Sequence, residues 1–261
     1  MPEGHTLHRL ARQLQPVVGR RLAASSPQGR FADGARVIDG RRLEDVAAYG
    51  KHLLLDFGDV HLHVHLGLAG AMFPADPAGT ARPGVRLRLV DGEGGTTWDL
   101  VAPIRCELWS DAERAALLAR LGPDPLRGDD PGPMFAQMAR SQKSIGQLLL
   151  DQAVVAGVGN VFRAEALHAC RIHPTRSGAT LTEGELHCLW DELTRLMERA
   201  TEEGRIITVD TPAEVERASI AEAEGRFVYK QERCRACDSP VRTWPLGSRT
   251  AYACELCQPA A

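Results

Sequence analysis

The sequence predicts a multidomain α+β protein, with an N-terminal helix and a mostly β domain, then a helical domain, then a small metal-binding hairpin. Three observations lead to this prediction. Short apolar and alternating runs dominate the first half, helix-compatible apolar spacing dominates the second, and two Cys-x-x-Cys pairs close the chain. With 261 residues, 44% of them hydrophobic, the chain can supply two ordinary domains with apolar cores.

The first domain is expected to cover residues 1–121. A helix is predicted at its start, over residues 2–17, with Pro2 near the first turn and with apolar residues at helical spacing at Leu7, Leu10 and Leu14. Short strand-like runs then alternate with Gly, Asp and Pro turns, at residues 52–55, 61–66 and 85–90. This pattern is typical of a β-sandwich or a barrel.

A linker is expected at residues 122–133, where Gly, Pro and Asp concentrate. The second domain, residues 134–226, is expected to be helical, with suitable apolar spacing at 145–155, 161–170 and 182–202. Thr182 and Glu185 fit a capping box at the start of the last of these helices. Residues 227–261 would form the third part, which carries the cysteine pairs.

The four cysteines near the C-terminal end predict one structural zinc ion. Sixteen residues separate the pair Cys234 and Cys237 from the pair Cys254 and Cys257. Each pair places two thiolates on one tight turn, and the intervening segment is long enough for a hairpin that completes a tetrahedral site. A disulfide or a chance arrangement is the alternative. A hairpin of this size needs the metal in order to fold.

The remaining cysteines, Cys106, Cys170 and Cys188, show no pairing pattern, and we expect them to be buried thiols. This usage suits a reducing cytosol. The N-terminus lacks the basic and apolar regions of a signal peptide, and no apolar stretch approaches the length of a membrane span. The expected protein is soluble and cytoplasmic, with no membrane partner.

The charge of the chain argues at first against a nucleic-acid partner, because 31 Lys and Arg face 34 Asp and Glu, a formal net charge of -3. The distribution is uneven, however. Arginines and Lys51 crowd the first fifth of the chain, whereas residues 183–224 are strongly acidic. Local asymmetry, rather than net charge, decides where a phosphate can bind.

A glycine turn at residues 156–160 precedes the helix expected at 161–170, and Asn160 is placed to cap that helix. Free backbone N–H groups at a helix N-terminus bind phosphate with help from the helix dipole. Taken alone, such a turn is more often a plain helical junction. The turn by itself therefore leaves both interpretations open.

Four motifs occur together in one order: Met1-Pro2-Glu3-Gly4, Tyr49-Gly50-Lys51-His52-Leu53, Gly157-Val158-Gly159-Asn160-Val161 and the cysteine pairs. In this combination the chain resembles the Fpg/Nei DNA glycosylases over nearly its whole length, and it is most similar to Nei-type members that begin Pro-Glu-Gly-His-Thr-Leu-His-Arg-Leu-Ala. The resemblance implies a β-sandwich domain, a helix-two-turn-helix domain and a zinc finger. It also implies a monomer, associated with the nucleoid, that binds damaged DNA in a cleft and flips out the damaged nucleotide.

The resemblance assigns the chemistry to the N-terminus. After removal of Met1, the secondary amine of Pro2 would attack C1′ of the damaged nucleotide, expel the base and form an iminium. That cation is an electron sink for β- and then δ-elimination of the flanking phosphates. Glu3 would be the general acid/base at the deoxyribose. From the dipeptide alone, an ordinary helix start remains the simpler interpretation.

The resemblance also implies contacts with DNA. Lys51 would belong to the catalytic group and reach the phosphate near the lesion, Asn160 would bind DNA at the glycine turn, and Arg249 would grip a phosphate from the hairpin turn. Leu68 matches the position of a residue that fills the gap left by the flipped base, where an apolar wedge is physically sensible.

The chain departs from the family pattern at His5, where many relatives have Glu, and at Gly146, where Fpg relatives carry Lys. Residues 99–108 also lack a clear Arg-Phe pair. These departures weaken a claim for 8-oxoguanine. The expected function is therefore a bifunctional DNA glycosylase/AP lyase of base excision repair that removes oxidised bases, with pyrimidines favoured. The alternatives are a noncatalytic zinc-containing protein that binds damaged DNA, and a zinc-ribbon regulatory factor.

The alternating histidines and Glu165 are two further polar features of the sequence. His61, His63 and His65 alternate along one expected strand and share one face, which superficially suggests a metal site. No fourth ligand stands at an obvious spacing, so we expect structural or hydrogen-bonding histidines. Glu165, in the helix after the glycine turn, is a candidate polar contributor to the site.

Overall fold

The computed structural model describes residues 2–260 except 78, 94, 212 and 213, and of residues 214–216 it describes the backbone alone. The chain divides into two compact units, Met1–Arg120 and Leu121–Ala261. Each unit has its own cluster of buried apolar side chains. Among the described residues, no helix combines the length and the apolar composition that crossing a membrane requires.

The first unit is a β-sandwich with a helix at its N-terminal end. Helix α1 (Gly4–Leu14) continues into the 3-10 turn η1 (Gln15–Val17). Two antiparallel sheets follow, a five-stranded sheet in the order β2-β1-β7-β8-β6 and a four-stranded sheet in the order β3-β4-β5-β9. The bounds of the strands are β1 (Arg21–Ser25), β2 (Arg41–Arg42), β3 (Asp45–Tyr49), β4 (His52–Asp56), β5 (His61–His65), β6 (Ala71–Ala75), β7 (Val85–Asp91), β8 (Thr97–Val101) and β9 (Arg105–Trp109). Two short helices, α2 (Ala32–Ile38) and α3 (Asp111–Leu118), complete the unit.

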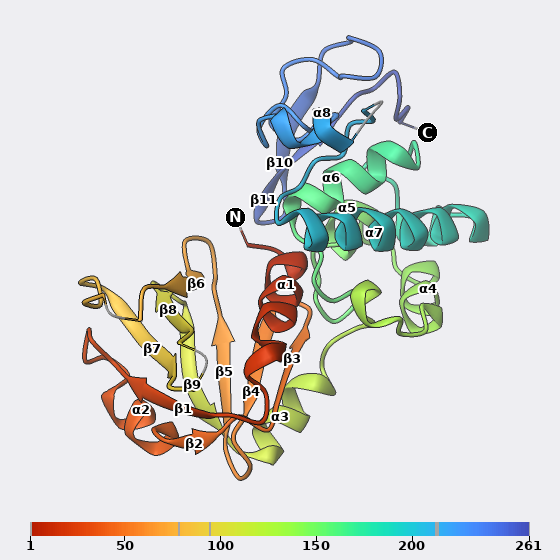
Figure 1. Cartoon of the computed structure of the whole chain (residues 1–261). Helices are drawn as coiled ribbons and strands as arrows, with labels where there is room; N and C mark the ends of the chain where they lie inside the picture. Colours follow the sequence, from red (N-terminus) through yellow and green to blue (C-terminus); the bar gives the residue numbers. More distant parts are fainter. Residues whose placement is uncertain (1, 78, 94, 212–213, 261) are drawn as a thin grey trace. The chain divides into compact units, whose positions relative to one another are not determined.

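Alternation of side chains along the strands builds the core of this unit. Every second residue of β7 is buried, and Leu53 and Leu55 of β4 are fully buried in the same cluster. Helix α1 lies against β3 and β4 (Figure 1) and adds its apolar face, including Leu7 and Leu14. The expected N-terminal helix and β-sandwich are therefore confirmed.

The second unit is helical up to a C-terminal hairpin. Its helices are η2 (Pro125–Arg127), α4 (Gly132–Ala139), α5 (Ile145–Leu148), α6 (Asn160–Ala169), η3 (Gly178–Thr180), α7 (Glu183–Glu203) and α8 (Glu214–Ser219). The hairpin pairs β10 (Arg242–Leu246) with β11 (Arg249–Ala253). Thr182 and Glu185 form the expected capping box at the start of α7, because each side chain satisfies a backbone N–H of the other residue.

The helix expected over residues 145–155 is wrong beyond its first turn, because α5 ends at Leu148. The chain then makes a series of tight turns that the side chain of Gln152 holds in place. Its amide donates to the Val158 carbonyl oxygen at 3.0 Å, and its oxygen accepts the Gly157 N–H at 3.0 Å. These side-chain bonds replace the helical ladder that apolar spacing alone had suggested.

The segment expected to be a linker, residues 122–133, begins with ordered and buried residues. The N–H of Gly122 donates to the Gln152 carbonyl oxygen at 2.9 Å, and the carbonyl oxygen of Pro123 accepts the Ala156 N–H at 3.0 Å. The contact-based division of the chain falls between Arg120 and Leu121. The breaker-rich sequence thus forms turns on the second unit, while the expected boundaries at residues 133 and 226 stay predictions.

Two of the three isolated cysteines are paired, which corrects the expectation of buried thiols. Cys170, at the end of α6, and Cys188, in α7, form a disulfide, and both are only half-buried. Packing of α6 beside α7 brings their Cα atoms to 5.9 Å, a proximity that a sequence separation of 18 residues does not reveal. Cys106 is a buried free thiol as expected.

Candidate nucleic-acid interface

The first two described residues, Pro2 and Glu3, precede the first helix. Pro2 is half-buried and Glu3 is the N-cap residue of α1 with a side chain that is only 1% exposed. The helix predicted from residue 2 therefore begins at Gly4, because the backbone of Glu3 is extended, and Pro2 lies just before its first turn. Met1 lies outside the described residues. Pro2 and a buried carboxyl group thus stand side by side at a helix start, as the predicted chemistry requires.

Lys51 lies in the two-residue turn between β3 and β4. Tyr49 pairs with His52 across this turn, so Gly50 and Lys51 are the turn residues. Gly50 has φ 56°, a left-handed conformation that favours glycine at the first position of such a turn. The motif Tyr-Gly-Lys-His therefore forms a β-hairpin turn, in which the half-buried Lys51 lies at the end of two strands.

Three histidines pack together beneath this turn. His52 Nδ1 lies 2.8 Å from His63 Nε2, and the His52 and His65 ring centroids are 5.1 Å apart. Burial, followed by the nearby His65 and Lys51, lowers the pKa of His52 to about 4, and burial above all lowers the pKa of His63 to about 3. These rings are therefore neutral at pH 7.

The alternating histidines, which were expected to be structural or hydrogen-bonding residues, each have a hydrogen-bonding partner. Among the described residues, a cluster suitable for a metal is formed by the four C-terminal cysteines alone. His61 instead places Nε2 2.8 Å from a carboxylate oxygen of Asp111, while His65 Nδ1 accepts the N–H of Gly67 at 3.0 Å. All three histidines therefore have hydrogen-bonding roles.

Leu68 is exposed on the turn that follows β5, with 61% of its surface accessible. Gly67 has φ 69°, and a Cβ at this glycine would lie 3.0 Å from Cβ of Ile104. Ile104 is itself 69% exposed. Two exposed branched apolar residues therefore flank one glycine turn, and sequence reasoning missed the second of them because it searched residues 99–108 for an Arg-Phe pair.

The glycine turn before α6 is tied to the C-terminal hairpin. Asn160 is the first residue of α6 and Gly159 is its N-cap, so the expected capping role of Asn160 is wrong. The Asn160 side-chain amide instead donates to the Thr250 carbonyl oxygen at 3.1 Å. An Asn amide has two N–H donors, and this bond uses one of them.

Arg163, which sequence reasoning missed, completes this connection. It is 1% exposed, and its guanidinium donates to the Thr250 carbonyl oxygen at 2.6 Å and to the Gly146 carbonyl oxygen at 3.3 Å. Arg249, exposed at the start of β11, precedes Thr250 directly. Asn160 and Arg249 are therefore held near each other through the backbone of Thr250.

Gly146 cannot accept a larger side chain without rearrangement. A Cβ at this position would lie 2.7 Å from a side-chain carbon of Leu246 and 2.9 Å from the Pro174 carbonyl oxygen. Real Cβ atoms do not approach a backbone oxygen so closely. The glycine that departs from the lysine of Fpg relatives therefore has a packing reason, because α5 lies directly against the end of the hairpin strand.

The four cysteines of the hairpin region fit a zinc ion. Their sulfur atoms all lie within 4.8 Å of one another, and the Cys234–Cys257 and Cys237–Cys254 sulfur pairs are 3.9 Å and 3.4 Å apart. A tetrahedron of Zn–S bonds of about 2.3 Å has edges of about 3.8 Å. Four thiolates would fill the coordination sphere, which is the arrangement of a structural site.

Helix α6 also contacts the metal-binding residues and the segment that leads to them. His168 Nε2 lies 3.3 Å from the sulfur of Cys234. The buried carboxylate of Glu165 accepts the backbone N–H groups of Phe227, Val228 and Tyr229. Glu165 is therefore a structural anchor, and these contacts assign it no direct part in a reaction.

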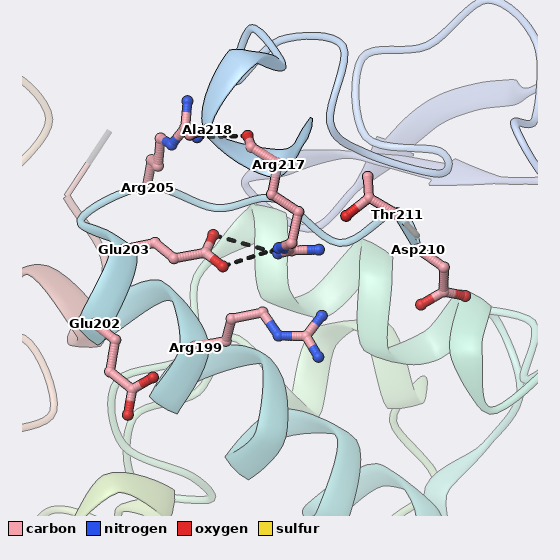
Figure 2. Close-up of a pocket in the computed structure, with 8 residues that line it drawn as sticks. All are labelled: Arg199, Glu202, Glu203, Arg205, Asp210, Thr211, Arg217 and Ala218. Carbon is pink, nitrogen blue, oxygen red and sulfur yellow. Dashed lines mark hydrogen bonds and ion pairs between the residues drawn. The ribbon is translucent and has the colours of Figure 1, made fainter. Parts of the chain in front are cut away.

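A hollow of about 550 Å³ lies at the end of α7 beside α8 (Figure 2). Three arginines and three acidic residues line it. Figure 2 shows Arg217 turned toward Glu203, to which it donates, and Arg217 also donates to the Ile207 carbonyl oxygen. Arg205 donates to the Arg217 carbonyl oxygen. These groups bind one another and fasten the segment to α7, so the hollow is a poor candidate for a ligand site.

Comparisons with known proteins agree with this arrangement. Residues 1–100 match the formamidopyrimidine-DNA glycosylase N-terminal domain, and residues 121–211 match the formamidopyrimidine-DNA glycosylase H2TH domain. Endonuclease 8 1 of Mycobacterium tuberculosis is 43% identical over 273 residues, covering 99% of this chain and 100% of the relative. The formamidopyrimidine-DNA glycosylase of Methylococcus capsulatus is 34% identical over 239 residues, covering 87% of this chain and 86% of the relative.

A solved structure shares the fold. The complex between the Lactococcus lactis Fpg and an abasic site containing DNA superposes with a TM-score of 0.79 at 22% identity, and the match covers 99% of this chain and 100% of that chain. The two domain matches and the relatives of near full length confirm the resemblance carried by the four motifs. The chain belongs to the Fpg/Nei family of DNA glycosylases.

Proposed function

We propose that this protein is a bifunctional DNA glycosylase/AP lyase of base excision repair that uses Pro2 as its nucleophile. The observation that carries the proposal is Pro2 placed directly before the buried Glu3 in a chain of this family. A proline α-amine is a secondary amine once the preceding methionine is removed. Mere binding of DNA would require neither residue.

In the proposed reaction, the Pro2 nitrogen forms a bond to C1′ as the bond from C1′ to the base breaks, and the proton that the amine loses balances the one that the departing base gains. Glu3 then donates a proton to the deoxyribose ring oxygen as the C1′–O4′ bond breaks. The ring-opened product is an iminium, which cannot lose a proton from nitrogen because the amine was secondary. It therefore withdraws electrons from C2′, where loss of a proton expels the 3′ phosphate, and a second elimination expels the 5′ phosphate. Hydrolysis of the iminium returns the free amine.

Each unit would contribute contacts with the DNA backbone. In the first unit, the ammonium group of Lys51 would pair with a phosphate near the lesion. In the second unit, the side-chain amide of Asn160 and the guanidinium of Arg249 would bind phosphate. The hydrogen bonds of Asn160 and Arg163 to the carbonyl oxygen of Thr250, which follows Arg249, favour this arrangement. Zinc, when bound by Cys234, Cys237, Cys254 and Cys257, would be structural and hold the hairpin that carries Arg249.

Leu68, together with Ile104, would fill the space left by the flipped nucleotide. Exposed apolar side chains on a glycine turn are costly in water, and insertion between bases would bury them. Oxidised pyrimidines are the proposed substrates, since the departures from the Fpg pattern, among them Gly146 and the lack of an Arg-Phe pair at residues 99–108, weaken a claim for 8-oxoguanine. The protein would act as a monomer in the cytoplasm, associated with the nucleoid when it binds DNA.

Borohydride reduction of the iminium tests the mechanism. Protein with zinc bound and with Pro2 as its first residue is incubated with duplex DNA that holds an abasic site, and a covalent adduct is expected on a denaturing gel. Binding of this DNA without an adduct would instead support the noncatalytic alternative. A panel of 5-hydroxyuracil, thymine glycol, 8-oxoguanine and hydantoin substrates then tests the base preference, and faster excision of 8-oxoguanine would overturn the pyrimidine assignment.

A further inference from the structure

The face of the four-stranded sheet that points away from the sandwich core carries a cluster of aromatic rings. In the antiparallel register, His63 lies opposite Leu54 on β4 and opposite Glu107 on β9. His63 is completely buried on this face, although it is a polar residue in a protein of modest size. Its surroundings explain how the burial is achieved.

His63 is enclosed by two other rings. Its ring stacks on Trp109 with centroids 3.7 Å apart and planes inclined by 19°. The second ring belongs to His52: the Nε2 atom of His63 lies 2.8 Å from the Nδ1 atom of His52, and the two imidazole planes are inclined by 28°. One neutral imidazole can donate and the other accept in this bond, so a single hydrogen bond fixes both rings.

The array ends directly at the lysine turn. His52 follows Lys51 in the chain, is the first residue of β4 and pairs with Tyr49 across the turn, so the bond that fixes the His52 ring also anchors the end of the two-residue turn. His52 also contacts the ring of His65, whose Nδ1 holds the N–H of Gly67 in the turn of Leu68. The rings thus connect the turn of Lys51 to the rigid centre of the sheet.

The charges around the array are mainly positive. Lys51, Arg105 and Arg120 all act to lower the pKa of His52, and Lys51 and Arg105 act on His65 in the same direction. Among the acidic residues on this face, Glu107 lies opposite His63 and is engaged by Arg105 and by the indole N–H of Trp109. Asp56 and Asp111 lie beside His61 instead. A proton gained by the histidine pair would therefore add a positive charge near these three cations and would remove a hydrogen-bond acceptor from the stack.

We propose that His52 and His63, supported by Trp109, are positioning residues that hold the Lys51 turn in the geometry needed to bind a DNA phosphate. This inference rests on the proposed function, because it takes the Lys51 contact from there. Neither histidine touches DNA in this account. Their effect on binding passes entirely through Lys51, and this dependence is measurable.

The test is equilibrium binding of the full-length, zinc-loaded protein to a duplex with a tetrahydrofuran abasic-site analogue, measured over a range of salt concentrations. His63→Phe keeps the ring and the stack on Trp109 but removes the bond to His52. We expect it to weaken binding about 10-fold and to lower the salt slope by about one, as Lys51→Gln does, because one phosphate contact is lost. His63→Gln, which can still bond to His52 Nδ1, should recover part of the slope.

The control is His61→Phe, which changes an equally buried histidine two positions away on the same strand. It should leave the salt slope unchanged. In a Lys51→Gln background, His63→Phe should cause no further loss of affinity. Should His63→Phe unfold the protein, His63→Leu against His61→Leu carries the same comparison, because leucine also cannot bond to His52.

An unchanged slope in the His63 variants, or an equal extra loss in the Lys51→Gln background, overturns the inference. So does a Lys51→Gln variant that binds with unchanged affinity and slope. Borohydride trapping of the wild-type protein, run in parallel, distinguishes failure of the positioning role from failure of the proposed function. A trapped adduct with an unchanged slope overturns the positioning role alone, whereas absence of an adduct overturns the proposed function.

Discussion

The two units hold their predicted site residues by different physical means. In the first unit, Lys51 and Leu68 lie on turns at the ends of strands whose inner faces form one apolar core. In the second unit, Asn160 and Arg249 depend on a few buried polar contacts with Thr250 and on four sulfur atoms. An apolar core tolerates substitutions that conserve its volume, whereas removal of one partner from a buried polar network leaves the other partner without its hydrogen bond.

Helix α6 makes this contrast specific. In ten residues it carries Asn160, the buried Arg163, the anchor Glu165 and the Cys234 neighbour His168. In the first unit, α1 contributes the apolar residues Leu7, Leu10 and Leu14 to the core. The second unit should therefore respond more sharply to changes in metal, charge and redox state.

Removal of zinc should have the largest effect. A hairpin with four thiolates and little apolar core depends on the metal for folding, so chelation should release Arg249 and the acceptor of Asn160. Loss of two charge-assisted contacts worth about 1.5 kcal/mol each predicts a fall in DNA affinity of about 100-fold. Binding titrations before and after chelation measure this. Loss of the sandwich fold of the first unit at the same time would contradict the proposed division of roles.

Arg163→Met should destabilise the second unit by about 3 kcal/mol, because the carbonyl oxygens of Thr250 and Gly146 lose a buried charged donor. Arg195→Met is the matched control, since Arg195 pairs with Glu192 on the exposed side of α7 and should cost about 0.5 kcal/mol or less. Urea unfolding of both variants provides the comparison. Equal costs would show that the contacts with Thr250 contribute little.

Reduction of the Cys170–Cys188 disulfide should destabilise the second unit by about 3 kcal/mol, the loop-closure contribution for a cross-link of 18 residues. A phosphine reductant should lower the thermal midpoint of the wild-type protein, and the Cys170→Ser/Cys188→Ser double variant should not respond. Mass spectrometry after alkylation under oxidising conditions checks the bond itself. Two alkylated thiols at these positions would refute the pairing.

Acid should lower the free energy of unfolding of the first unit gradually as the pH falls. The pKa of His52 is about 4 and that of His63 about 3 in the folded protein, both below the ordinary value of 6.5. The unfolded chain therefore binds more protons between pH 6.5 and pH 4, so stability present above pH 6.5 is lost as the pH falls. The slope is about 1.4 kcal/mol per pH unit for each such histidine. Urea unfolding at pH 7, 6 and 5 should show a shallower decline for His63→Phe, and identical slopes would contradict buried neutral rings.

Local sequence codes predicted the features that depend on neighbouring residues. The capping box at Thr182, the clustering of the four cysteines and the N-terminal helix are all fixed within a few residues or by a known ligand spacing. The turn at Gly50 and Lys51 was not predicted, although it also depends on neighbouring residues, because its glycine supplies the left-handed backbone. Such features can be read from one sequence without knowledge of the packing.

Features that depend on tertiary packing were missed or misassigned. Cys170 and Cys188 pair because α6 packs on α7, and Asn160 bonds to Thr250, ninety positions away, instead of capping its helix. Ile104 is a candidate only because it is exposed, and Arg163 only because it is buried, and neither property is visible in the sequence. A sequence pattern cannot distinguish a buried arginine from a solvated one, because both are helical residues with the same local neighbours.

The location of the covalent adduct tests the central claim most directly. After borohydride trapping on abasic-site DNA, the protein is digested and the peptide that carries the sugar fragment is sequenced by mass spectrometry. The account predicts that the modification lies on the nitrogen of Pro2, and that protein with residues retained before Pro2 gives no adduct. An adduct on Lys51 or another lysine, or full trapping by the extended protein, would contradict the N-terminal nucleophile.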